Sequence, residues 1–239
     1  MQKVFAVMIA SGFLLVFPLM ADEIAVSGED ELVKTKGSFK EVWVHPEADL
    51  SRYDGLFAWQ PVFQFRETED VRRTISRSAL LSGRYTSAPI DESSRVTFEE
   101  IVTEAVLKEL KRSKQFEVVD AVKPGTLIVR GSWLDIVSVV PPSSPSIRDV
   151  YLSHVGEATF VFELIDAETG VIQARVSERR RIQPPSRMNR VSTVPANRVT
   201  VFNDVRIWAA DVARDLRKAL DKAKKTADKQ AEANAEAKN

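Results

Sequence analysis

The chain has 239 residues, with 34 Lys and Arg side chains balanced by 34 Asp and Glu side chains, two His and no Cys. This balance gives no overall field that would attract a polyanion, so a charged partner has to be bound by a local patch. The lack of Cys excludes disulfides, cysteine catalysis and a lipid attached to cysteine. Two His are too few for a zinc site of the ordinary kind.

The amino terminus has the pattern of a secretory signal peptide. Lys3 supplies a positive charge, Val4 to Leu19 form an apolar run, and Ala21 precedes the acidic pair Asp22 and Glu23. This order predicts that residues 1–21 are removed and that the remaining chain works in the bacterial periplasm. The alternative is an uncleaved inner-membrane anchor, for which an apolar run of about 16 residues is short.

Export also limits the partners and cofactors that we expect. Nucleic acid and cytoplasmic nucleotides are not present in the periplasm, and the sequence has no glycine-rich phosphate loop. We therefore predict no cofactor, no metal and no nucleic-acid partner, and contact with a membrane only through the signal segment.

The first part of the mature chain is predicted to be irregular. Residues 22–38 are polar and mixed in charge, which is typical of a flexible leader. Aromatic and β-branched residues predict short strands at 39–45 and at 56–65, with Pro61 indicating a bulge or a sheet edge in the second. Residues 67–95 begin with a short basic helix pattern and become rich in Ser, Gly and Pro, so they are predicted to be a long exposed insertion.

Two amphipathic helices are predicted. Thr97 and Glu100 have the spacing of a capping box, which places the start of the first helix at Thr97 and its end near Ser113. The second helix runs from Val201 to Leu220, where apolar residues recur at helical spacing. Residues 221–239 contain mainly Ala and charged residues and are predicted to be a tail that frays into solvent.

Between the helices the pattern is that of strands. Runs at 116–119, 126–140, 155–165 and 171–182 are apolar or alternate in polarity, and Asp166 to Gly170 predicts a hairpin turn between the last two. We therefore predict a single α/β domain of the α+β type over residues 39–220. Its single mixed, largely antiparallel sheet has five or six strands, with both helices on one face.

The middle of the chain also resembles a known family. The residues that carry the resemblance are Asp49–Tyr53, Leu56–Phe65, Phe116–Asp120, Gly125–Gly131, Asp135–Val137 and Val155–Gly170. They resemble the bacterial domain of unknown function 3313, over most of residues 49–220. The resemblance implies an exported envelope protein without an established activity. Members are often lipoproteins, from which this chain departs because it lacks the lipid-bearing Cys. The order of elements is also similar to the α/β modules of outer-membrane assembly and secretion lipoproteins.

Catalytic patterns are sparse. The two histidines, His45 and His154, lie far apart in the sequence, and no Gly-x-Ser-x-Gly motif accompanies them. An envelope glycan or ester hydrolase remains an alternative, and it would require a pocket that gathers His154, a carboxylate and a Ser. The acidic residues of the 166–170 turn fit a hairpin better than a calcium loop.

Arginine clustering is the feature that most favours a function. The candidate partner-binding residues are Arg72, Arg73, Arg77, Arg84, Arg179, Arg181, Arg187 and Arg190. Strand alternation places Arg179 and Arg181 on one face and Arg180 on the other. Arginine binds carboxylates and phosphates, so we predict docking of an acidic envelope component or protein partner. The alternative is a solvated edge strand whose charges prevent aggregation.

The predicted function is therefore that of an exported, non-enzymatic envelope protein that binds or scaffolds. Two alternatives remain: the hydrolase described above, and a subunit of an envelope assembly that pairs through its strand edges or its last helix.

Overall fold

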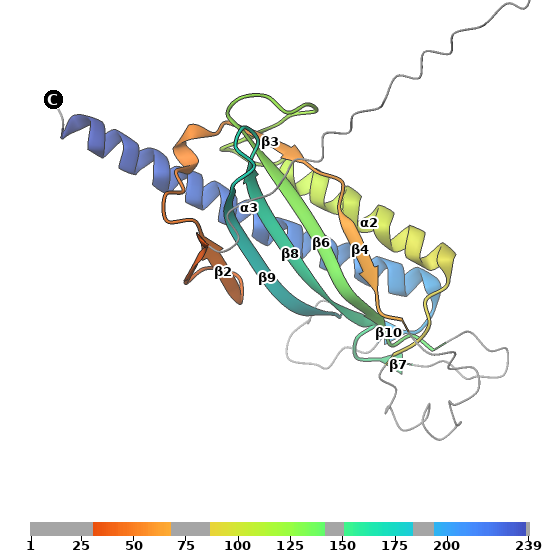
Figure 1. Cartoon of the computed structure of the whole chain (residues 1–239). Helices are drawn as coiled ribbons and strands as arrows, with labels where there is room; N and C mark the ends of the chain where they lie inside the picture. Colours follow the sequence, from red (N-terminus) through yellow and green to blue (C-terminus); the bar gives the residue numbers. More distant parts are fainter. Residues whose placement is uncertain (1–30, 68–86, 142–150, 184–193, 238–239) are drawn as a thin grey trace, which may run out of the picture.

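The structure is a computed structural model that describes residues 31–67, 87–141, 151–183 and 194–237 (Figure 1). Its main sheet has eight strands in the order β1-β2-β9-β8-β6-β3-β5, with β4 beside β6. These strands are β1 (Val33–Thr35), β2 (Glu41–Val44), β3 (Gly55–Ala58), β4 (Val62–Phe65), β5 (Glu117–Val118), β6 (Thr126–Ser138), β8 (Gly156–Asp166) and β9 (Ile172–Ile182). A separate pair joins β7 (Tyr151–Leu152) to β10 (Val194–Pro195).

Two helices, α2 (Glu92–Leu110) and α3 (Arg198–Glu236), lie behind the main sheet on the same face (Figure 1). A short 3-10 helix, η2 (Leu50–Arg52), precedes β3. The predicted α/β class and mixed sheet are confirmed. Eight strands form instead of five or six because the strand predicted at 56–65 is divided into β3 and β4, and because β1 has only three residues, too few to show a sequence period.

The centre of the sheet is antiparallel, with β6 beside β8 and β8 beside β9. The strand predicted at 56–65 forms two strands, β3 and β4, which both run parallel to β6. Pro61 lies between them and has no N–H to donate to a ladder. The register of β4 also shifts between Phe63 and Phe65. The interruption expected at Pro61 is therefore present.

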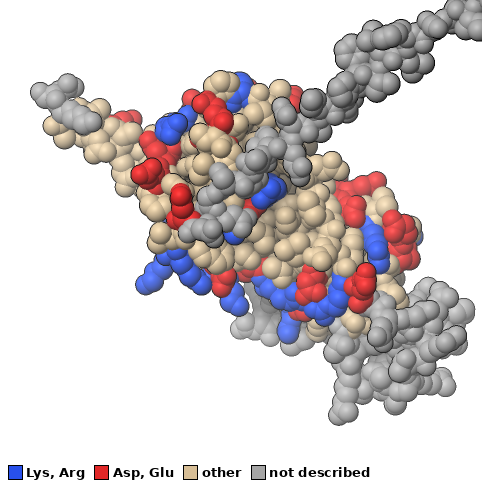
Figure 2. Space-filling view, in the orientation of Figure 1, with Lys and Arg blue, Asp and Glu red and all other residues tan. Residues whose placement is uncertain are grey.

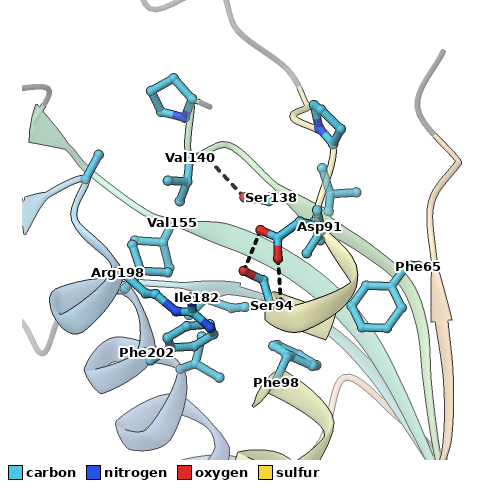
Figure 3. Close-up of a pocket in the computed structure, with 17 residues that line it drawn as sticks. Phe65, Asp91, Ser94, Phe98, Ser138, Val140, Val155, Ile182, Arg198 and Phe202 are labelled. Carbon is cyan, nitrogen blue, oxygen red and sulfur yellow. Dashed lines mark hydrogen bonds between the residues drawn. The ribbon is translucent and has the colours of Figure 1, made fainter. Parts of the chain in front are cut away.

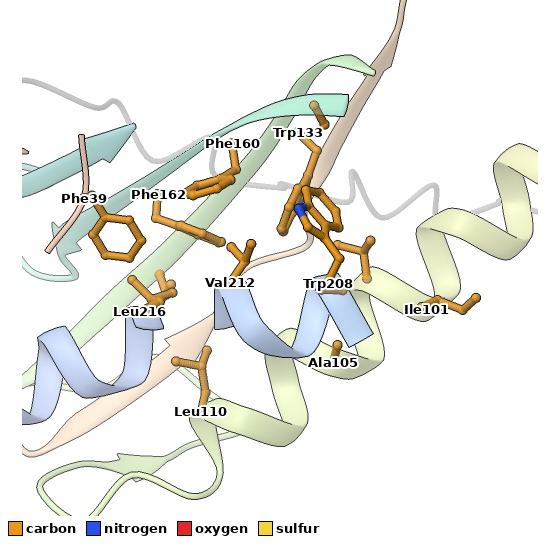
Figure 4. Close-up of a cluster of buried hydrophobic side chains, with 14 of the residues drawn as sticks. Phe39, Ile101, Ala105, Leu110, Trp133, Phe160, Phe162, Trp208, Val212 and Leu216 are labelled. Atoms are coloured by element: carbon orange, nitrogen blue, oxygen red, sulfur yellow. The ribbon is translucent and has the colours of Figure 1, made fainter. Parts of the chain in front are cut away.

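The core lies between the sheet and the helices (Figure 4). Trp133 of β6 contacts Phe160 and Phe162 of β8, with ring centroids 5.8 and 5.6 Å apart, and Trp208 of α3 at 5.2 Å. The predicted apolar stripe of the first helix is buried against this cluster. A smaller cluster of Ile128, Ile165 and Ile172 lies apart from it.

The first helix begins earlier than predicted. Asp91 is the N-cap of α2, and its carboxylate accepts a hydrogen bond from the N–H of Ser94 at 2.9 Å. Thr97 lies inside the helix, where its hydroxyl donates to the carbonyl of Ser93. Residues 92–95 therefore belong to α2 and not to the exposed insertion, and Ala88 is buried. Asp91 caps the helix six residues before the predicted capping box at Thr97.

The two ends of the domain also differ from the prediction. Val33–Thr35 of the predicted leader form β1, which pairs antiparallel with β2. At the other end α3 does not fray after Leu220 but continues to Glu236, and Lys224, in the next turn, is buried against the loop that contains η2. No helix in the described ranges is both long and apolar enough to cross a bilayer. The predicted signal, residues 1–21, lies outside these ranges.

Candidate ligand-binding cleft

Six of the eight predicted partner-binding arginines, Arg72, Arg73, Arg77, Arg84, Arg187 and Arg190, lie outside the described residues. The other two, Arg179 and Arg181, are in β9. The predicted alternation is confirmed, because Arg179 contacts Thr159 and Asp135 on the uncovered face, whereas Arg180 binds Asp215 of α3 on the helix-covered face.

Arg179 is already paired within the protein. Its guanidinium binds Asp135 at 2.7 Å and Glu157 at 2.6 Å, and Asp135 also binds Arg66 through two hydrogen bonds. Arg181 is 67% exposed at its side chain and only 4.0 Å from Glu157. Figure 2 shows blue and red side chains next to one another near this end of the sheet. Because these charges are paired within the protein, they favour the alternative role, in which charged side chains on an exposed strand prevent aggregation.

The histidines do not form the arrangement that a hydrolase requires. His45 directly follows β2 and lies beside the start of β9, where its backbone N–H donates to the Gln173 carbonyl, and its ring binds Glu31. His154 lies at the other end of that strand, beside Ser153, with 3.2 Å between Nδ1 and Oγ. Burial, and then the charge of Arg181, lower the pKa of His154. Within the described residues, no carboxylate hydrogen-bonds His154, and neither histidine lines either of the two cavities described below.

A cleft of about 290 Å³ lies where the amino-terminal ends of α2 and α3 meet the ends of β6 and β9 (Figure 3). Its walls are mostly branched aliphatic and aromatic. The apolar residues that line it include Phe65, Phe98, Val137, Val140, Val155, Ile182, Val201, Phe202 and Val205. The polar residues are Asp91 and Ser94 of the α2 end, Ser138 of β6, and Arg198 of α3. This combination of apolar walls and a few polar groups is typical of small-molecule sites.

Asp91 has its hydrogen-bonding capacity filled by its own helix. One carboxylate oxygen accepts from the hydroxyl of Ser93 and the N–H of Ser94, and the other accepts from the hydroxyl of Ser94. These bonds lower the pKa of Asp91 to about 2. Asp91 is therefore an ionised cap, and its oxygens are not available as a general base at neutral pH.

Arg198 is the cation of the cleft. It is the first residue of α3, its guanidinium lies 5.5 Å from the centre of the Phe202 ring, and Nη2 is 3.4 Å from the hydroxyl oxygen of Ser93. No ion pair joins it to a carboxylate among the described residues, in contrast to Arg179 and Arg180. The first turn of α3 also carries no acidic residue.

Local sequence explains why both helices begin at this cleft. Asn197 caps α3 in the same way that Asp91 caps α2, by accepting from the N–H of the residue three positions later, Thr200. Each N-cap residue is followed by residues that turn inward to the cleft, such as Phe98 and Val201. The sequence therefore carries a signal for each helix start, at Asp91 and Asn197, but none for the meeting of the two starts. Placing the helix starts at Thr97 and Val201 excluded both caps, and the cleft was missed.

A second cavity, of about 270 Å³, lies under the break between β3 and β4. It is lined by Trp59, Pro61, Val106, Trp133 and Phe162, among others, and none of its lining residues is charged. Gly131 borders it, and a Cβ there would lie 3.1 Å from the Phe162 ring. This cavity has no group that would select a ligand by charge.

In the part of the chain that the structure describes, no group of three or more His, Asp or Glu side chains is placed so that it could bind a metal ion. The acidic turn at 166–170 is the predicted hairpin turn, with Gly170 at a φ of 71° and its N–H donating to the carbonyl of Asp166. Asp166 itself binds the N–H of Glu168 and the hydroxyl of Tyr53.

Comparisons with known proteins do not identify a family. No protein-family model matches the chain, and no curated protein matches it. The resemblance to the domain of unknown function 3313 therefore stays a prediction.

Several solved structures are similar to this chain in the arrangement of their helices and strands, but with low TM-scores. A Xanthomonas campestris protein of the domain of unknown function 330 has a TM-score of 0.43 and 8% identity, covering 77% of this chain and 93% of that one. A neuraminyllactose-binding hemagglutinin homolog from Helicobacter pylori has a TM-score of 0.39 and 10% identity, covering 74% and 90%. The PelC dodecamer from Paraburkholderia phytofirmans has a TM-score of 0.34 and 11% identity, covering 78% and 96%. Scores this low establish neither a common family nor a common function.

Proposed function

We propose that this chain is an exported, non-enzymatic protein of the bacterial envelope that binds its ligand in the cleft between the amino-terminal ends of α2 and α3. The observation that carries the proposal is the position of Arg198 on the wall of a largely apolar cleft, where no carboxylate of the described residues forms an ion pair with it. The amino-terminal pattern of residues 1–21 supports export.

The chemistry of the cleft supports binding over catalysis. Its carboxylate is committed to capping α2, and its hydroxyls belong to Ser94 and Ser138, of which Ser94 donates to Asp91. A hydrolytic site needs a base within hydrogen-bond reach of a nucleophile. Neither histidine is among the residues that line the cleft.

The predicted acidic partner is consistent with Arg198, although this residue is not among the eight arginines predicted from the sequence. The proposal differs from the sequence-based prediction in the location of the site that binds the acidic ligand. The uncovered sheet face presents paired charges at Arg179, whereas the cleft presents an arginine that can pair with a ligand. We therefore assign the acidic ligand to the cleft.

Ligand retention tests this proposal. The protein is purified from the envelope of its native host, and small molecules released on denaturation are identified by mass spectrometry. Ala196→Trp, which places an indole at the wall of the cleft, should eliminate the retained molecule. Arg206→Gln, on an exposed position of the same helix, is the matched control and should leave it bound.

Retention that is equal in parent, Ala196→Trp and Arg206→Gln proteins would reject the cleft as the binding site. A thermal melt of each variant distinguishes blocked binding from unfolding, and Val140→Phe supplies a second blocking substitution from β6's end of the cleft. Recovery of the native protein from the cytosol with Met1 attached would reject the envelope role.

A further inference from the structure

The size and lining of the cleft indicate what kind of molecule fits it. At about 290 Å³ it would hold about ten water molecules, at about 30 Å³ each. This is at the lower end of the range for ligand pockets. Branched aliphatic and aromatic side chains form its walls, including Val140, Val155, Ile182 and Phe202. The space therefore suits one short apolar chain and is too small for a lipid with two long chains.

The charge of Arg198 determines which head group the ligand can carry. Arg198 offers a planar guanidinium with five N–H donors, and the structure gives it one polar contact, with the Ser93 hydroxyl. The Arg198 residue is exposed, and its guanidinium lies 5.5 Å from the centre of the Phe202 ring, a contact that favours this position at the mouth of the cleft. A carboxylate or phosphate could take the remaining donors through charge-assisted bonds. A cationic group placed there would instead be repelled by Arg198.

Asp91 offsets only part of this preference, because the charge of Arg198 is the smallest of the causes that lower its pKa. It is the one carboxylate on the described wall of the cleft, and both of its oxygens accept hydrogen bonds from the first turn of α2. Its charge acts on the positive end of α2, as N-terminal acids do, and also on Arg198, whose charge helps to lower the pKa of Asp91. The first turn of α3 carries Arg198 and no acid. An anion would therefore find the positive charge of the cleft on its α3 side.

We propose that the cleft binds a single-chain amphiphile with one anionic head, of the fatty acid or alkyl phosphate class, with the head on Arg198 and the alkyl chain along the valine, isoleucine and phenylalanine wall. This inference rests on the proposed function, which makes the cleft the ligand site. It adds the chemical class of the ligand and the residue that selects it.

Calorimetric titration tests the class of ligand. Protein purified from the native host and stripped of bound molecules is titrated with octanoate, decanoate, dodecanoate, dodecyl phosphate and dodecyltrimethylammonium, each below its micelle concentration. We expect one site per chain for the anions and an affinity that rises about fourfold for each methylene until the cleft is filled. Dodecyltrimethylammonium should bind at least tenfold more weakly than dodecanoate.

Substitutions of Arg198 test whether this residue binds the head group of the ligand. Arg198→Gln should weaken dodecanoate at least tenfold, because a bond to a charged head is lost, while Arg206→Gln should match the parent protein. Arg198→Lys, which keeps the charge without the planar fork, should fall between them. A thermal melt shows that each variant is folded.

Each other outcome overturns the inference in a distinguishable way. If Arg198→Gln leaves dodecanoate binding unchanged, or the ammonium amphiphile binds as tightly, the head-group assignment is wrong, although the cleft remains the ligand site if Ala196→Trp still abolishes binding. If Ala196→Trp has no effect on any ligand, the proposed function fails with it. Binding to phosphatidylglycerol vesicles without binding of monomeric dodecanoate would show a membrane surface and not a free amphiphile as the ligand.

Discussion

Lys224 and Ser51 join the carboxyl-terminal half of α3 to the loop that precedes β3, through a hydrogen bond of 3.0 Å from Nζ to the Ser51 carbonyl. The same ammonium group lies 3.1 Å from Asp228 and 3.3 Å from Asp54, and the Lys224 side chain is only 7% exposed. This contact holds the turn of α3 that follows Leu220 against the domain, although the sequence offers no large apolar residue there.

Lys224→Ala is therefore expected to lower the free energy of unfolding by about 1–2 kcal/mol, because a buried charge-assisted hydrogen bond is lost. Urea denaturation measures the change. Lys225→Ala removes an exposed lysine from the next position and should have an effect within about 0.5 kcal/mol. Equal effects of the two substitutions would show that the contact with Ser51 does not stabilise the domain.

The cap of α2 has a pH signature. Hydrogen bonds from Ser93 and Ser94 lower the pKa of Asp91 from 3.8 to about 2. A lowered pKa gives stability that is fully present above about pH 4 and is lost as the pH falls towards 2. Asp91→Ala should cost about 1 kcal/mol at pH 7 and remove this dependence.

Asp91→Asn is the matched control for that experiment. Asparagine caps a helix about as well as aspartate, so stability at pH 7 should stay near that of the parent while the acid dependence from this site disappears. Thermal melts between pH 2 and pH 7 compare the three proteins. An Asn variant that loses as much stability at pH 7 as the Ala variant would contradict the role of Asp91 as a cap.

Tyr53 and Asp166 form a buried pair that anchors the hairpin turn. The Tyr53 hydroxyl donates to Asp166 at 2.9 Å, and both residues are less than 5% exposed. Burial alone would raise the pKa of Asp166, but hydrogen bonds from the Glu168 N–H and the Tyr53 hydroxyl hold it below its ordinary value.

Tyr53→Phe should lower the free energy of unfolding by about 1–3 kcal/mol at pH 7, because the buried carboxylate loses a partner. The pKa of Asp166 should rise, so the stability that depends on its ionised form would be lost at a higher pH during acidification. Carboxyl NMR titration of Asp166 measures the pKa directly. An unchanged pKa in the Phe variant would show that the Tyr53 hydroxyl contributes nothing to the ionised state.

Much of the sheet could be predicted from the sequence because its strands show a strong period. In β8, Ala158, Phe160 and Phe162 recur at every second position and are all buried, whereas Thr159 and Val161 between them are only partly buried. In β9 the same alternation separates Arg179 from Arg180. Such patterns depend on which residues face the core, which the sequence records directly.

The parts that could not be predicted depend on local competition or on distant partners. Thr97 has a valid capping box, but Asp91 caps the helix earlier, and the pattern alone does not rank two caps. The contact of α3 beyond Leu220 with the domain depends on Lys224 meeting Ser51, 173 residues away in the sequence. The cleft likewise requires two helix ends that are about 100 positions apart in the chain to meet, a relationship that arises only on folding.

The most direct test of the cleft as the ligand site is a methyl NMR titration of the native protein with dodecanoate. We predict that the largest chemical-shift changes fall on the cleft methyls, those of Val137, Val140, Val155, Ile182 and Val201, and that Ala196→Trp suppresses them. Largest changes on Val106 beside the second cavity, or on Val161 of the uncovered sheet face, would contradict the assignment.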